Sequence, residues 1–213
     1  MMVSKRSIDD VNYYFITDEG IDIPPHEQVR KAVQAGVKMV QYRDKSSSTR
    51  KMYEEAGKIR KICKDTLFIV NDRLDIALAV GADGVHLGQD DLPPEAARDI
   101  VGEGMMIGVS THDLDQAKEA EKIADYIGIG PVHSTETKED TSEELGIDGI
   151  LDITSKVKLP ATAIGGIGKE DLERLAEGVD MVCAISSVTR KGDLFEKISL
   201  FERKFSEAKE VFR

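Results

Sequence analysis

Residues 67–73 read Leu-Phe-Ile-Val-Asn-Asp-Arg, and residues 82–91 read Ala-Asp-Gly-Val-His-Leu-Gly-Gln-Asp-Asp. Each segment is a short apolar run that ends in polar residues with a carboxylate, Asp72 in the first and Asp91 in the second. Short runs of this kind are typical of parallel strands that are covered on both faces. Parallel strands of one barrel end at the same rim, so the two carboxylates are expected to lie there together. Such a pair can bind Mg²⁺, which commonly accompanies a phosphorylated substrate.

The same kind of apolar run recurs along the whole chain, and amphipathic helical segments lie between the runs. The strand candidates are Tyr13–Thr17, Met39–Arg43, Leu67–Asn71, Gly84–Leu87, Met106–Ser110, Tyr126–Gly130, Ala161–Ile164 and Met181–Ile185. The predicted helices include His26–Ala35, Arg50–Lys64, Asp113–Ala124, Lys169–Glu177 and Asp193–Lys209, and Pro93-Pro94 marks the start of another. This alternation predicts an α/β protein whose residues 1–213 form a single (β/α)₈ TIM barrel. Residues 131–145 are polar and irregular, and they are predicted to form a mobile active-site loop.

Composition excludes several classes of function. The net charge of −11 disfavours a nucleic-acid partner, because binding to phosphate backbones needs a positive surface. The two cysteines, Cys63 and Cys183, lie far apart and are predicted to be buried free thiols of a reducing compartment. No apolar run approaches the roughly 20 residues of a membrane span, and the first residues lack a secretion signal. We therefore expect a cytoplasmic protein that binds small molecules and has no membrane partner, and a homo-oligomer stays open.

Polar residues that follow the predicted strands form the candidate site. After the second strand come Gln41, Arg43 and Lys45, which alternation along an extended segment places on one side. A guanidinium and an ammonium group at alternating positions suit a pyrophosphate. Considered alone, the two cations also fit a surface ion-pair network, and Asp72 and Asp91 also fit structural carboxylates paired with arginine. Cations and carboxylates on successive strands together favour a site for Mg²⁺ and pyrophosphate.

The segment Gly165-Gly166-Ile167-Gly168 follows the seventh predicted strand. Loops after strands seven and eight of such barrels often bind phosphate, and glycines let the backbone approach an anion closely. An ordinary tight turn is the alternative. His86 is expected to face the barrel mouth, in a structural or a catalytic role, whereas His112 and His133 are read as surface residues.

At these residues the chain resembles the thiamine-phosphate synthase family. Individually the matching segments are modest evidence, but they occur in the order of the family and span nearly the whole chain. They are Gln41-Tyr-Arg43-Asp-Lys45, Asn71-Asp72-Arg73, Gly84-Val-His86-Leu-Gly88-Gln89-Asp-Asp91, Gly108-Val-Ser110-Thr-His112, Gly130-Pro131, Thr135-Glu-Thr137-Lys138 and Ala163-Ile-Gly165-Gly166-Ile167.

The resemblance implies a transfer reaction that joins an aminopyrimidine methyl pyrophosphate to a thiazole phosphate, with Mg²⁺ stabilising the leaving pyrophosphate. The family is described as forming a pyrimidine carbocation first, which the thiazole nitrogen then captures. Such a dissociative reaction mainly requires stabilisation of the leaving group and a closely held acceptor. The candidate residues agree with this, because they include no Ser-His-Asp arrangement and no obvious nucleophile.

The resemblance also assigns roles position by position. It implies that Asp72 and Asp91 ligate Mg²⁺, and that Arg43, Lys45 and Lys138 are catalytic cations. The contacts implied for the pyrimidine pyrophosphate are Gln41, Arg43, Lys45, Asn71, Ser110 and Lys138. Those implied for the thiazole phosphate are Thr135, Thr137, Gly166 and the backbone near Val182 and Cys183.

The chain departs from the family pattern in three places. Cys183 stands where serine is common, His133-Ser134 replace a usual Phe-Pro, and Asp44 replaces a glutamate. Two other functions stay open. One is a regulatory or thiazole-modifying paralogue that lacks transfer activity, and the other is a phosphate-binding isomerase. The isomerase would leave the carboxylates unused and would usually need a clear acid–base pair.

Overall fold

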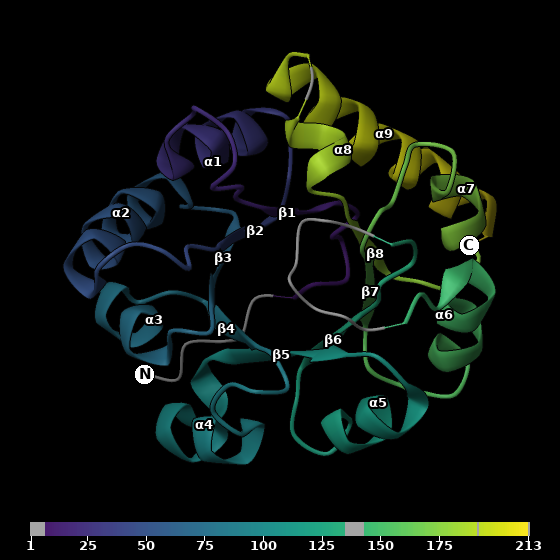
Figure 1. The fold of residues 1–213 in the computed structure, drawn as a ribbon, viewed down its shortest axis with the longest axis horizontal. Coiled ribbons are helices and arrows are strands. Elements are labelled where there is room, and N and C mark those ends of the chain that lie inside the picture. The colour runs from purple at the N-terminus through teal and green to yellow at the C-terminus, as the bar shows by residue number, and fades with distance from the viewer. Residues whose placement is uncertain (1–6, 135–142, 191, 213) are drawn as a thin grey trace.

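The computed structural model of the chain describes residues 7–134, 143–190 and 192–212. Its centre is an eight-stranded sheet in which each strand runs parallel to the next (Figure 1). A bridge between Tyr13 and Val182 joins the last strand to the first, so the sheet closes. The strands are β1 (Tyr14–Ile16), β2 (Met39–Tyr42), β3 (Leu67–Asn71), β4 (Gly84–Leu87), β5 (Met106–Thr111), β6 (Tyr126–Ile129), β7 (Ala161–Ile164) and β8 (Met181–Cys183). The predicted (β/α)₈ barrel is confirmed.

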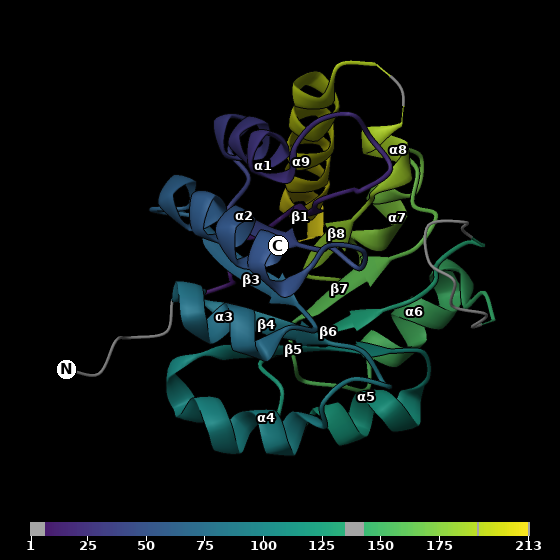
Figure 2. The ribbon, with the colours of Figure 1, turned by 60° about the vertical axis from the view of Figure 1, so that its left-hand side comes forward.

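Helices surround the barrel on the outside (Figures 1 and 2). They are α1 (Pro25–Gln34), α2 (Thr49–Ile62), α3 (Leu74–Val80), α4 (Pro94–Val101), α5 (Leu114–Ala120), α6 (Gly146–Thr154), α7 (Leu172–Leu175), α8 (Ser186–Thr189) and α9 (Leu194–Phe212), with a short 3₁₀ helix, η1 (Gly102–Gly104), after α4. The long α9 packs against α1, α7 and α8 and so closes the outer ring. Within the described ranges, no helix has the length and apolar composition needed to cross a membrane.

Two helices are much shorter than the sequence predicted. The predicted helix Asp113–Ala124 is observed as α5, because the backbone N–H groups of residues 122 and 123 bond to carbonyls three residues back and tighten the last turn. The predicted helix Lys169–Glu177 is observed as α7, only four residues long. There the Asp171 carboxylate accepts the N–H of Gly168 at 2.7 Å, which holds residues 168–171 in a turn before the helix starts.

The apolar residues form two layers. The larger core lies between the outer face of the sheet and the helices, and it includes Phe68, Val85 and Ile107. The smaller core fills the interior of the barrel with side chains such as Tyr14 and Met39. Successive strand residues alternate between the two layers, which is why the strands read as continuous apolar runs rather than as alternating ones.

Four carboxylates hold the amino ends of the odd-numbered strands, at the end of the barrel away from the mouth. We call these contacts the floor clamps. Each carboxylate accepts a backbone N–H at the start of its strand. The donor–acceptor pairs are Tyr13 to Glu202 at 3.0 Å, Phe68 to Asp83 at 2.9 Å, Ile107 to Asp125 at 2.8 Å and Ala161 to Asp180 at 2.8 Å. The three aspartates also donate their own N–H to the carbonyl of the same residue, so each fixes the register of a strand pair at two points.

Candidate functional site

The carboxyl ends of the strands surround a cavity with about 490 Å³ of empty space, part of it open to solvent. Predicted site residues Gln41, Arg43, Asn71, His86 and Ser110 all line it. The strand register explains this gathering, because Asn71 pairs with His86 across β3 and β4, and paired residues face the same side of a parallel sheet. The five residues therefore lie together at one mouth of the barrel, at the carboxyl ends of the strands.

Asp72 and Asp91 also come together at this rim. Burial and the hydrogen-bonding contact with the Asp91 carboxyl raise the pKa of Asp72 above its usual value. The N–H of Asp72 donates to the His86 carbonyl at 2.8 Å, which continues the pairing of β3 with β4. Asp91 is held by the N–H of Gly88, which donates to its Oδ2 at 2.7 Å. Two adjacent carboxyl groups repel each other when both are charged, so the pair favours a proton or a cation between them.

This pair has the chemistry of a magnesium site. Mg²⁺ is usually bound by one or two carboxylates, together with water and the phosphate oxygens of a substrate. Among the described residues, no group of three or more His, Cys, Asp or Glu side chains is placed to hold a metal ion. Asp72 and Asp91 would therefore hold Mg²⁺ only together with water and substrate oxygens.

The predicted cations lie beside the carboxylates. Lys45 Nζ forms an ion pair with Asp72, and more than half of the Lys45 side chain is exposed. Glu19 supports the turn after β2, because it accepts the N–H of Lys45 at 2.9 Å and lies 3.9 Å from the guanidinium of Arg43. Asp44 takes no part in this pairing: it accepts hydrogen bonds from the Tyr42 hydroxyl and from backbone N–H groups of the turn.

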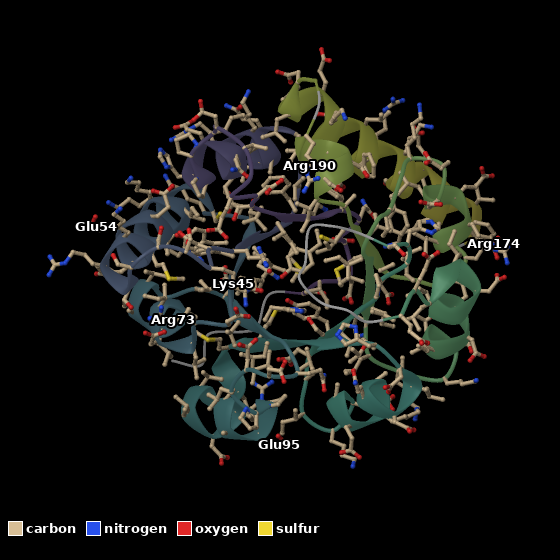
Figure 3. All side chains as sticks on the ribbon, in the orientation of Figure 1. Lys45, Glu54, Arg73, Glu95, Arg174 and Arg190 are labelled. Carbon is tan, nitrogen blue, oxygen red and sulfur yellow. The ribbon has the colours of Figure 1, made fainter. Side chains whose placement is uncertain are left out.

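Arg73 follows Asp72 directly but faces away from the site. Its guanidinium donates to Asp75 at 2.6 Å and to the Thr49 hydroxyl at 3.0 Å, and so it ties the start of α3 to α2. In Figure 3, Lys45 lies nearer to the centre of the barrel and Arg73 lies further out, toward α3. The Asn-Asp-Arg motif thus divides its side chains between the mouth and the scaffold.

A continuous chain of hydrogen bonds crosses the base of the cavity, and we call it the bore relay. Gln41 Nε2 donates to the Tyr14 hydroxyl at 2.7 Å, and the Tyr14 and Tyr126 hydroxyls are 2.9 Å apart. The Tyr126 hydroxyl lies 3.0 Å from His86 Nδ1, and His86 Nε2 lies 3.0 Å from Ser110 Oγ. All five residues are buried. His86 therefore faces the mouth, as predicted, with both ring nitrogens in hydrogen bonds.

Gly108 makes this relay sterically possible. A Cβ atom at Gly108 would lie 2.2 Å from the Tyr126 ring and 2.5 Å from His86 Nδ1. Tyr126 can reach His86 only because it passes over a residue without a side chain. Residue patterns did not identify Tyr14 or Tyr126 as part of the site. The sequence did contain one signal for them. Gly108 lies at an inward position of β5, and the neighbouring strand β6 carries the inward-facing Tyr126.

The loop after β6 contains three predicted site residues, Thr135, Thr137 and Lys138, which lie outside the described residues. The described start of this loop pairs with the segment after β7, where Val132 and His133 donate their N–H groups to Ile164 and Gly165. A Cβ atom at Gly166, where φ is +67°, would lie 2.7 Å from the His133 Cβ. Close packing against this loop is thus one reason for glycine at that position.

His133 and His112 are more engaged than surface residues would be. His133 contacts Glu144 at 3.3 Å and Asp171 at 3.2 Å, and so links the loop to the segment before α7. Burial works against protonation of His133, but the two carboxylates outweigh it and raise the pKa of the imidazole above 6.5. His112 Nδ1 lies 2.7 Å from the Gly130 carbonyl and supports the backbone at the end of β6.

The structure separates the two residues predicted on the last strand. Cys183 faces the interior of the barrel and lines the cavity, whereas the side chain of Val182 packs under the helices. The N–H of Val182 donates to the Asn12 carbonyl at 3.0 Å, so this group is used to close the barrel. Ser186 and Ser187 follow at the start of α8, where the Ser187 hydroxyl donates to the Ile167 carbonyl at 2.6 Å.

Comparison with known proteins gives a consistent result along nearly the whole chain. The model of a family described as thiamine monophosphate synthase matches residues 13–188. The chain is 45% identical over 196 residues to a thiamine-phosphate synthase of Methanosarcina barkeri, covering 90% of this chain and 89% of the relative. It is 45% identical over 191 residues to one of Archaeoglobus fulgidus, covering 88% and 90%. A solved thiamine phosphate pyrophosphorylase from Pyrococcus furiosus superposes with a TM-score of 0.87 at 38% identity, covering 94% and 98%.

Proposed function

The chain belongs to the thiamine monophosphate synthase family, and from this premise we propose how its barrel mouth carries out the transfer reaction. The substrates are 4-amino-2-methyl-5-hydroxymethylpyrimidine pyrophosphate and 4-methyl-5-(2-hydroxyethyl)thiazole phosphate. The products are thiamine phosphate and pyrophosphate. The observation that carries the proposal is the contact of Lys45 with the Asp72–Asp91 pair at the rim of the cavity. Cations and paired carboxylates side by side suit a pyrophosphate bound with Mg²⁺.

The leaving group is held by Arg43 and Lys45, with Lys138 predicted to join them. Asp72 and Asp91 would hold Mg²⁺, which when bound neutralises part of the charge of the pyrophosphate. The exposed Lys45 side chain is free to exchange Asp72 for a phosphate oxygen when the substrate enters. Arg43 lies 3.9 Å from Glu19 and is held only loosely, so its guanidinium is likewise available to a phosphate.

The course of the reaction is dissociative. The bond between the pyrimidine methylene carbon and the pyrophosphate oxygen breaks first, and its electron pair leaves with the pyrophosphate. The thiazole nitrogen then donates its lone pair to the methylene carbon and forms the new C–N bond. Gln41, Asn71 and Ser110 line the cavity as polar groups that can hold the pyrimidine ring in place while this bond breaks. The thiazole phosphate binds near Gly166 and Cys183, with Thr135 and Thr137 as predicted partners.

The test is an assay of thiamine phosphate after incubation with both substrates. We expect product with Mg²⁺ and none when a chelator removes divalent cations. Absence of product with enzyme equimolar to substrate would contradict the proposal and favour a paralogue without transfer activity. Calorimetric titration with pyrophosphate separates the isomerase alternative, because our proposal requires pyrophosphate binding that depends on Mg²⁺.

A further inference from the structure

When the His86 imidazole carries one proton, the bore relay can adopt only two proton arrangements. Each tyrosine hydroxyl has one proton to donate, and a neutral imidazole has one N–H. Burial raises the pKa of both Tyr14 and Tyr126, so both phenols stay protonated. The direction in which one member donates therefore sets the direction for all the others, from Gln41 at one end to Ser110 at the other.

The orientation of Gln41 selects one arrangement. Its Nε2 faces Tyr14 and can only donate, so the Tyr14 proton points to Tyr126. Tyr126 then donates to Nδ1 of His86, and the N–H at Nε2 of His86 donates to Ser110 Oγ. Among the described residues, the two ends that remain for a ligand are the side-chain carbonyl of Gln41, which is an acceptor, and the hydroxyl proton of Ser110, which is a donor.

Thr162 gives a second and independent indication of a polar ligand. This residue of β7 is 2% exposed and lines the same cavity. Its hydroxyl is buried without a hydrogen-bond partner among the residues that the structure describes. A buried hydroxyl without a partner destabilises the folded protein, and a polar group of a bound ligand would remove that cost.

We propose that Tyr14, Tyr126 and Thr162 determine the selectivity of this cavity for an aminopyrimidine ring. The relay presents an acceptor at Gln41 to the amino group of the ring and a donor at Ser110 to a ring nitrogen. The Thr162 hydroxyl makes a further hydrogen bond to the ring. Tyr14 and Tyr126 are positioning residues, because they act through the ends of the relay. This inference rests on the proposed function, which identifies the pyrimidine as the ligand.

The test compares two probes by calorimetry in the presence of Mg²⁺: the aminopyrimidine pyrophosphate and its 4-oxo analogue. The analogue replaces an amino donor by a carbonyl acceptor, so it opposes the polarity of the relay. We expect the wild-type protein to bind the amino probe at least about tenfold more tightly. Tyr126→Phe breaks the relay and lets Ser110 and Gln41 each reverse direction, so this ratio should fall toward one. A ratio that Tyr126→Phe leaves unchanged would overturn the relay.

Tyr13→Phe is the matched control. The Tyr13 hydroxyl is equally buried and donates to the Ala184 carbonyl at 2.5 Å, but it lies in the outer core and outside the relay. Its loss should lower stability and leave the ratio of the two affinities unchanged. If Tyr126→Phe does not fold, Tyr14→Phe breaks the same relay one bond earlier and is judged by the same ratio.

Thr162→Val tests the direct contact, since valine keeps the shape and replaces the hydroxyl with a methyl group. Without ligand, the variant should melt at the same temperature as the wild type or at a higher one, because the buried hydroxyl that lacked a partner has been removed. Its affinity for the amino probe should fall about tenfold. Unchanged affinity would remove Thr162 from the proposal.

Binding of Mg²⁺ and pyrophosphate without the ring separates this inference from the proposed function. Tyr126→Phe should bind them as the wild type does, because its change lies below the rim. A wild-type protein that fails to bind them would contradict the proposed function itself. A wild-type protein that binds them but has equal affinity for the aminopyrimidine probe and its 4-oxo analogue would contradict only the selectivity proposed here.

Discussion

Asp72 combines backbone strain with charge repulsion at a single residue. It is the one described non-glycine residue with a positive φ, 58°, a conformation that costs on the order of 1 kcal/mol. Its carboxyl group also lies against that of Asp91. Both features work against stability. The carboxyl group nevertheless lies at the rim, where it pairs with Lys45. Strain of this kind is typical of residues that are maintained for function.

Asp72→Gly should therefore separate stability from activity. Glycine adopts φ of 58° without strain, and the variant also removes the repulsion with Asp91, so we expect thermal stability without Mg²⁺ to be unchanged or higher by about 1 kcal/mol. Turnover should fall at least about 100-fold. Thermal melting and the thiamine phosphate assay provide the two measurements. Alanine is a poorer variant here, because it retains the backbone strain; a clear loss of stability in Asp72→Gly would indicate a structural carboxylate.

His133 is the second residue with a distinct role, because it joins the loop after β6 to Asp171. Its pKa in the folded protein lies above the unfolded value of 6.5. The stability from this contact is thus fully present below about pH 6.5 and is lost as the pH rises through the raised pKa. His133 therefore provides an ionisable contact between the loop after β6 and Asp171.

His133→Gln should remove that pH dependence. We expect the variant to melt below the wild type near about pH 5.5 and to approach it near about pH 8.5. Melting curves across this range measure the difference. His112→Gln is the control, because the His112 ring bonds to the backbone carbonyl of Gly130. A difference between wild type and His133→Gln that grows with pH would contradict the assignment.

At the scale of elements, short apolar runs were sufficient to predict the strands. Each strand is covered on both faces, so β3 and β4 read as continuous apolar segments with polar residues directly after them. Helix ends were harder to predict, because the start of α7 depends on the contact between Asp171 and Gly168, which apolar periodicity does not report. The bore relay was missed because Tyr14 and Tyr126 are 112 residues apart in sequence and meet only through the register of the barrel.

Arg98 on α4 shows how one helix is attached to the floor of the barrel. Its side chain is 11% exposed, and the guanidinium donates to Asp125 at 2.7 Å and to the carbonyl groups of Gly102, Met105 and Ile123. Asp125 in turn holds the N–H of Ile107 at the start of β5. One ion pair thus connects a helix, a loop and a strand.

Asp125→Ala should destabilise the protein by about 3 kcal/mol, because it leaves a largely buried guanidinium without its carboxylate and a backbone N–H without its acceptor. Activity per folded molecule at 25 °C should stay at the wild-type level, since the change lies at the end of the barrel away from the mouth. Chemical denaturation and the product assay measure the two effects. Asp99→Ala, on the exposed face of the same helix, is the control and should change stability by less than about 0.5 kcal/mol.

At the scale of the whole molecule, the floor clamps follow a fourfold pattern. Asp83, Asp125 and Asp180 occupy the position just before β4, β6 and β8, and Lys38 occupies it before β2. A lysine cannot accept the N–H of Tyr13, and Glu202 from α9 does so in its place. A comparison of the four quarters of the chain does not reveal this repeat, because each quarter shows it at only one position, directly before its even-numbered strand.

The clamps should act independently of one another. Asp83 and Asp180 hold different strand pairs and share no partner, so the destabilisation in Asp83→Ala/Asp180→Ala should equal the sum of the single changes within about 0.5 kcal/mol. Urea denaturation of the two single variants and the double variant gives this comparison. A deviation above about 1 kcal/mol would show that the floor behaves as one cooperative unit.

The use of Glu202 as the fourth clamp has a consequence for the engineering of such barrels. In three quarters the clamp lies within the quarter itself, whereas the first quarter depends on a carboxylate from the terminal helix α9. Chimaeras should therefore tolerate exchange of a whole β-α-β-α quarter bounded by two aspartate clamps. Exchange of the first quarter should require α9 to be transferred with it.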